Sequence, residues 1–150
     1  MRQGLATWKT TGARIAVPLY LTLLAEGYTK AGQFEEAWHL TTEALEVANR
    51  TGERFCEAEL YRLQGQLLLA GAGANQHEGE RCFQQALTIA GRQQAKFWEL
   101  RAAMNLGQLW QKQGKRDPAR QLLGEAYRCF KEGFDTPDLR EAGTLLKALA

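Results

Sequence analysis

Few residues of this chain are of types that could do metal chemistry. The 150 residues include two histidines, His39 and His77, and although glutamates lie three or four residues from each, no second His and no Cys lies on the same face of its expected helix. Because a zinc site needs three or four such ligands, the sequence predicts no metal site. We expect His39 to be a partly exposed surface residue and His77 to lie at the start of a helix.

The cysteines offer little nucleophilic or redox chemistry. Cys56, Cys82 and Cys129 are odd in number and widely spaced, which excludes a dense disulfide framework and any CxxC motif. No histidine occupies a matching position from which it could activate one of these thiols. We therefore interpret the cysteines as small packing residues of a protein in a reducing compartment.

Phosphate and acid–base chemistry are also poorly supported. The glycine-rich segment 71–74 lacks the lysine and the preceding strand of a phosphate-binding loop, so we expect a turn between helices. Glu35, Glu36, Glu78 and Glu80 have no nucleophile beside them and fit the first turns of helices, where carboxylates interact favourably with the helix dipole. The sequence thus predicts a protein without enzyme activity or cofactor.

The composition is that of a folded protein, with 45% hydrophobic and 24% charged residues. Nineteen basic and seventeen acidic side chains give a net charge of +2, which by itself favours no class of partner. No run approaches the roughly 20 apolar residues of a membrane span, and residues 1–16 lack the apolar core of a secretory signal. We expect a cytoplasmic protein that does not contact the membrane.

The pattern of apolar residues favours helices throughout. Strong helix formers dominate, and the chain has only three prolines. Leu21, Leu24, Ala25 and Tyr28 follow the i, i+3, i+4, i+7 spacing of one helix face, and no stretch alternates long enough for a convincing strand. The fold class predicted is all-α.

The helical pattern repeats along the chain. Small residues in the first helix of each expected pair step by 40 and 42 residues, and those in the second helix step by 42 and 40. Small residues at such positions let two antiparallel helices approach closely. These landmarks are Ala25, Gly65 and Gly107 in the first helices, and Ala37, Gly79 and Ala119 in the second helices.

Glycines and capping residues predict where these helices end and begin. Gly12, Gly52, Gly91 and Gly133 recur at nearly the same interval and are expected to end second helices. Other signals are expected to begin helices: Asn75 three residues before Glu78, Asp117 before Pro118, and Asp135-Thr136 before Pro137.

Within each unit the pattern resembles the tetratricopeptide repeat (TPR). That repeat has a small residue, then a large apolar one, a glycine near the turn, and further small residues; Ala25, Tyr28, Gly32 and Ala37 match it. The second unit is the poorest match because Gln64 occupies an apolar position. The resemblance implies a right-handed α-solenoid of about three antiparallel helix pairs with a leading partial repeat and a C-terminal capping helix.

The expected organisation is a single repeat domain over residues 1–150. Leu5 and Trp8 match the second helix of a unit whose first helix is missing, so we expect the chain to be a fragment of a larger protein. The expected parts are a repeat tail (2–14), three repeats (15–52, 53–91 and 92–133) and a capping helix (135–150).

A longer resemblance covers nearly the whole chain. Segments 51–69, 82–110 and 113–142 look like the C-terminal helical region of bacterial multidomain regulators, which carry a nucleotide cyclase or DNA-binding domain followed by a STAND-type ATPase. The resemblance implies a regulatory, protein-binding module of a cytoplasmic signalling protein. Any cyclase or ATPase activity would then belong to other domains.

The TPR resemblance also implies a binding groove, because first helices line the concave surface of such arrays. The basic residues among the candidates given below suggest that the groove binds an acidic protein segment, which could come from upstream domains of the same protein. The Lys/Asn clamp of chaperone-binding members is not reproduced. Carried over by position, the candidate groove residues are Glu26, Lys30, Arg62, Gln66, Arg101, Gln108 and Lys112, with Thr22, Thr29, Glu59, Leu69, Met104 and Gln111 also facing inward.

Two other functions stay open at this point. Residues 92–131 carry a net charge of +6 together with Phe97, Trp98 and Trp110, a combination that nucleic acid or an acidic protein could use. Trp110, however, occupies the core aromatic position of its repeat, and Phe97-Trp98 lie at a junction that packing is expected to cover. The second alternative is self-association through the apolar strip of Leu5 and Trp8.

Overall fold

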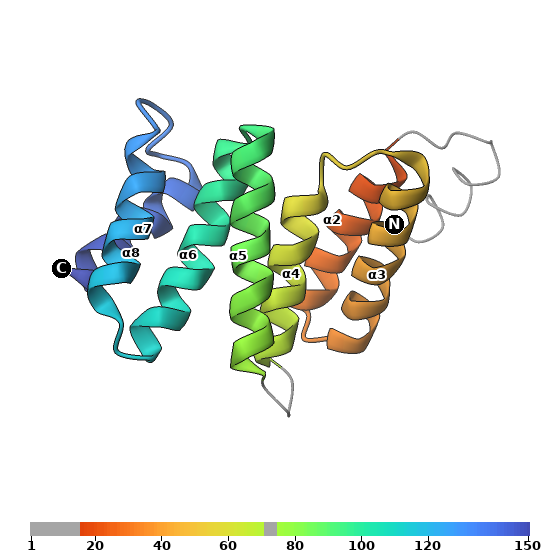
Figure 1. Cartoon of the computed structure of the whole chain (residues 1–150), viewed down its shortest axis with the longest axis horizontal. Helices are drawn as coiled ribbons and strands as arrows, with labels where there is room; N and C mark the ends of the chain where they lie inside the picture. The colour runs from red at the N-terminus through yellow and green to blue at the C-terminus, as the bar shows by residue number, and fades with distance from the viewer. Residues whose placement is uncertain (1–15, 71–74) are drawn as a thin grey trace.

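The computed structural model describes residues 16–70 and 75–150 of the chain (Figure 1). Within these residues all regular structure is α-helical, which confirms the predicted all-α class. The predictions for residues 2–14 and for the turn at 71–74 lie outside the described residues. The helices are α2 (Val17–Lys30), α3 (Phe34–Thr51), α4 (Glu57–Ala70), α5 (Gln76–Gln93), α6 (Lys96–Lys112), α7 (Arg116–Arg128) and α8 (Pro137–Leu149).

The helices stand side by side along the long axis of the molecule, with α2 and α3 at one end and α7 and α8 at the other (Figure 1). Each helix packs on the next one in the chain, and α2, α4, α6 and α8 also contact one another in turn. Side chains on these four alternate helices can therefore meet although they are far apart in sequence.

Small residues allow the close packing of the first helix pair, as the sequence predicts. Ala25 of α2 and Ala37 and Ala44 of α3 are completely buried, and Leu21 is buried among them. Large neighbours fill the space left by small ones, as in any well-packed interior.

The second pair packs even more tightly. A Cβ atom added to Gly65 of α4 would lie 2.5 Å from the ring of Phe83 of α5, which is itself fully buried. A Cβ atom on Gly79 would lie 3.3 Å from the backbone oxygen of Gly65. Glycine at position 65 is therefore a requirement of the α4–α5 contact, while the contact at Gly79 is close but less restrictive.

Helix α8 covers the end of the third pair. Its residues Leu139, Ala142, Leu145 and Leu149 are buried in one hydrophobic cluster with residues of α6 and α7. Burying a leucine side chain contributes roughly 1.5–3 kcal/mol. These four buried residues, with the partly buried Leu146, attach α8 to the pair.

Some predicted helix ends are confirmed and others are wrong. The Asn75 side chain accepts a hydrogen bond from the backbone N–H of Glu78 at 3.1 Å, and Gly52 ends α3 in the left-handed conformation. Gly91 does not end α5, because the helix continues to Gln93 and Gln94 takes the left-handed conformation instead. Asp117 does not cap α7, because the helix already begins at Arg116.

The beginning of α8 is as predicted, but its details differ. Pro137 is the first helical residue, yet the Thr136 hydroxyl donates to the backbone oxygen of Gly133 instead of capping the helix. Gly133 does not follow α7 directly, since that helix ends at Arg128. The glycine instead shapes the loop between α7 and α8, where its φ is 77°.

Candidate functional site

The predicted groove residues lie on α2, α4 and α6, which contact one another in turn. The structure joins four of them, Glu26, Lys30, Arg62 and Arg101, through ion pairs in which Glu59 takes part. Gln66, Gln108 and Lys112 are not part of these contacts. The predicted site therefore divides into two parts with different properties.

Arg62 is almost completely buried, with 4% of its surface exposed. Its guanidinium donates two hydrogen bonds to the carboxylate of Glu59, at 2.8 and 2.7 Å, and a third to the side-chain oxygen of Asn105 at 2.8 Å. Glu59 is equally buried, so each charge satisfies the other inside the protein. Arg62 thus stabilises the α4–α6 contact and does not project into a groove.

Arg101 of α6 connects the remaining helices of this face. It donates to Glu26 of α2 at 2.7 Å, lies 2.7 Å from the carboxylate of Glu59 on α4, and reaches within 4.0 Å of Asp138 on α8. Burial alone would lower the pKa of Arg101, but the charge of Glu59 and the hydrogen bond to Glu26 outweigh it and raise the pKa. One side chain therefore links four helices.

Glu26 is the outer end of this arrangement. Burial raises the pKa of its carboxyl, but hydrogen bonds from Arg101 and Lys30, together with their charges, leave the pKa below the usual glutamate value. Lys30 lies 3.1 Å from the Glu26 carboxylate, one helical turn further along α2. The network is thus charge-balanced, with three carboxylates and three basic side chains: Glu26, Glu59, Asp138, Lys30, Arg62 and Arg101.

This network was not predicted from the sequence, because its members lie on four different helices. Two members, Asn105 and Asp138, were not among the candidates at all. A usable signal for the Glu59–Arg62 pair was present, since opposite charges three residues apart in a helix can meet. The longer contacts, such as Glu26 to Arg101, depend on how the helices stack.

The second part of the predicted site is open. Gln66 of α4 and Gln108 of α6 are half-buried, and Lys112 of α6 is exposed. None of the three forms a hydrogen bond or ion pair with another residue of the described structure. The three residues lie on α4 and α6, two helices that pack together, one to three helical turns beyond the ion-paired residues of the same helices. We call Gln66, Gln108 and Lys112 the open polar stripe.

The other predictions about chemistry can be compared with the structure. Within residues 16–70 and 75–150, no group of three or more His, Cys, Asp or Glu side chains could hold a metal ion. His39 and His77 are exposed. Cys56 is buried, as a packing residue should be, and burial raises the pKa of its thiol to about 11. Cys129 is exposed, so the packing interpretation is wrong for this residue, which lies just beyond the end of α7.

The aromatic residues of the basic segment differ in their surroundings. Trp110 is half-buried, and its indole N–H donates to the carboxylate of Glu80 on α5 at 2.8 Å. Phe97 was expected to be covered by packing at its junction, but its side chain is 49% exposed. Its ring contacts that of Phe130 edge-to-face, with 4.9 Å between the ring centres. Phe97 lies in the first turn of α6.

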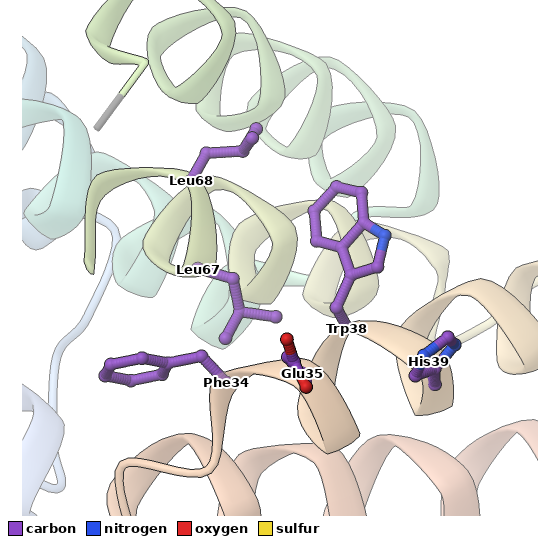
Figure 2. A pocket seen from close by; sticks show the side chains of 6 residues that line it. All are labelled: Phe34, Glu35, Trp38, His39, Leu67 and Leu68. Carbon is purple, nitrogen blue, oxygen red and sulfur yellow. The ribbon is translucent and has the colours of Figure 1, made fainter. Parts of the chain in front are cut away.

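An apolar pocket that the sequence did not indicate lies between the beginning of α3 and the end of α4 (Figure 2). Its volume is about 400 Å³. Phe34 and Trp38 are exposed by 36% and 39%, which is unusual for such large apolar side chains. The residues that line this pocket, which we call the Trp38 pocket, are Phe34, Glu35, Trp38, His39, Leu67 and Leu68.

No protein-family model matches the chain, and no curated protein matches it in sequence. In the part of the chain that the structure describes, none of the helices combines the length and apolar character needed to cross a bilayer.

Proposed function

We propose that this chain is a non-catalytic protein-binding module built as a TPR-like, right-handed α-solenoid, with a leading partial repeat and α8 as its capping helix. The observation that carries the proposal is the open polar stripe. Two amides and an ammonium group project from two adjacent helices without partners in the described structure. Polar groups of this kind on a rigid surface are suited to hydrogen-bonding a peptide.

The ion-pair network supports this function by holding the neighbouring helices in place. Because Arg101 contacts residues of α2, α4 and α8, the spacing of these helices is set before any ligand arrives. A preorganised surface binds with a smaller loss of conformational entropy. The network itself is charge-balanced, so an acidic segment would be attracted chiefly by Lys112 and not by Arg62 or Arg101.

The cellular role follows from the resemblance in the sequence. In this proposal the module regulates a cytoplasmic bacterial signalling protein, and its partner is an acidic segment or an upstream domain of the same protein. Cyclase or ATPase chemistry belongs to such domains and not to these 150 residues. No cofactor is required.

The proposal is tested with peptides selected against the wild-type chain from a random phage-displayed library. The dissociation constants of the enriched peptides are then measured by fluorescence anisotropy. Lys112→Glu is expected to weaken the binding of acidic peptides by tenfold or more, about 1.4 kcal/mol, because it reverses the one exposed charge of the stripe. The double variant Gln66→Ala/Gln108→Ala is expected to weaken binding further, since it removes both amides.

Arg120→Glu is the matched control, because it makes the same change of charge at an exposed position of α7. Circular dichroism must show an unchanged helical signal for every variant. If the selected peptides bind the Lys112→Glu and double-alanine variants like wild type but lose affinity for Arg120→Glu, the binding site lies on the outer helices and the proposed site is wrong. A failure to select any peptide also contradicts the proposal.

A further inference from the structure

The Trp38 pocket lies in the acidic part of the molecule. Residues 26–59 carry eight acidic and three basic side chains, a net charge of −5. Glu35 lines the pocket, and Glu36 follows it on the surface of α3. Neither forms an ion pair with another described residue. The pocket therefore combines exposed aromatic surface with uncompensated negative charge.

The opposite end of the molecule carries the complementary charge. Residues 92–131 hold nine basic and three acidic side chains, a net charge of +6, of which Lys96 and Arg101 are already paired with carboxylates, and the exposed Glu132 follows this range. Arg128 and Lys131 are exposed there and have no ion-pair partner in the described structure. In Figure 1 the acidic helix α3 and helix α7, which carries Arg128, lie toward opposite ends of the long axis.

The basic end also presents an apolar group. Phe97 is half exposed, and its ring contacts that of Phe130, which lies between Arg128 and Lys131 in the chain. An aromatic side chain bordered by basic residues is the complement of an aromatic pocket bordered by glutamates. Both halves of such a contact exist in this one sequence.

We propose that the chain associates head to tail with a second copy of itself: the basic edge of one copy, Phe97, Arg128 and Lys131, docks against the Trp38 pocket and the Glu35–Glu36 carboxylates of the next. The rings of Phe97 and Trp38 supply apolar contact, and the opposite charges supply orientation and a fast encounter. This interface shares no residue with the open polar stripe, so its test does not depend on the proposed peptide site.

A head-to-tail contact uses two different surfaces of the same molecule. Each added copy therefore leaves one pocket and one basic edge unoccupied, and the assembly can grow beyond a dimer. Because its charged groups are exposed, the association should weaken as salt screens them. Concentration-dependent growth and salt sensitivity together form its signature.

The experiment is sedimentation velocity over a wide range of protein concentrations at low and high salt. Wild type is expected to sediment faster as its concentration rises at low salt, and to lose this dependence at high salt. Glu35→Lys/Glu36→Lys and Arg128→Glu/Lys131→Glu are each expected to abolish the dependence, because each places like charges across the contact.

The decisive measurement mixes the two charge-reversed variants in equal amounts. Each pocket then faces an edge of opposite charge, so the mixture is expected to associate although neither variant does so alone. Phe97→Ser should also abolish association, whereas Phe55→Ser, at a similarly exposed phenylalanine outside the interface, should not. A wild-type chain that stays monomeric at low salt overturns the proposal, as does a mixture of the variants that fails to associate.

Discussion

Helices α4 and α6 each pack on the helix that follows them, and their glycines Gly65 and Gly107 lie 42 residues apart, yet the contacts of the two helices differ. Gly65 of α4 is pressed against the ring of Phe83, and a Cβ atom there would lie 2.5 Å from it. At the equivalent Gly107 of α6, the nearest atoms to an added Cβ are 3.8 and 3.9 Å away, which is ordinary contact. Glycine is thus required at position 65 of α4, whereas a larger residue fits at position 107 of α6.

The polar interiors of the two helices differ in the same way. Helix α4 buries Glu59, Arg62 and Gln64, and each has a hydrogen-bond partner. At the positions of Arg62 and Gln64, α6 has Met104 and Leu106, which are buried in apolar surroundings. Two helices with a similar spacing of small residues therefore stabilise their interiors by different means.

The largest effect is expected from removing the buried carboxylate of α4. Glu59→Leu leaves the charge of Arg62 buried without its main partner, and breaking such a pair costs about 3–5 kcal/mol. Arg62→Met, which copies the α6 residue, should cost less because Glu59 keeps its contact with Arg101. Urea unfolding measures both, and equal losses would show that Arg101 does not support Glu59.

The two glycines should respond in opposite directions to the same substitution. Gly65→Ala is expected to destabilise the protein by about 1–3 kcal/mol, because the buried ring of Phe83 has no room to move. Gly107→Ala should be neutral or stabilise by up to about 1 kcal/mol, because alanine is the better helix former. Thermal unfolding followed by circular dichroism measures the stability of both variants. A loss of stability in Gly107→Ala would show that the added methyl group does not fit there.

Helix beginnings offer a smaller contrast between α5 and α7. Asn75→Ala removes a side-chain cap and should cost about 1 kcal/mol. Lys115, at the same place before α7, forms no such cap, so Lys115→Asp should stabilise the protein by several tenths of a kcal/mol or more. The free energy of unfolding in urea tests both changes, and an unaffected Asn75→Ala variant would mean that solvent replaces the cap.

The smallest effect is expected at Gln64, the residue that departs from the repeat pattern. Its amide donates to the hydroxyl of Thr41 at 3.4 Å, a long contact, and that hydroxyl also donates to the backbone oxygen of Trp38. Gln64→Leu, the residue of α6, should therefore change stability by less than about 0.5 kcal/mol. A loss above 1 kcal/mol in the same unfolding assay would assign Gln64 a structural role that its geometry does not suggest.

The sequence by itself determined the features that depend on neighbours a few residues away. The period of apolar residues predicted helices, the small residues at Ala25 and Ala37 predicted where the first pair approaches closely, and Asn75 predicted the start of α5. The helical period and the cap rest on interactions within one or two helical turns, and the first pair joins two helices that are adjacent in the chain. Helix ends were less certain because the chain can extend a helix past a glycine, as α5 does past Gly91.

Tertiary structure alone decided which of the predicted groove residues are paired with other side chains of the protein and which have no side-chain partner in the described structure. The contact between Glu26 and Arg101 joins residues 75 positions apart, and its formation depends on the angle at which α2, α4 and α6 stack. The Trp38 pocket likewise exists only because α3 and α4 meet there. Local spacing places a side chain on one face of its helix, but the partners of that side chain are set by the packing of helices from other parts of the chain.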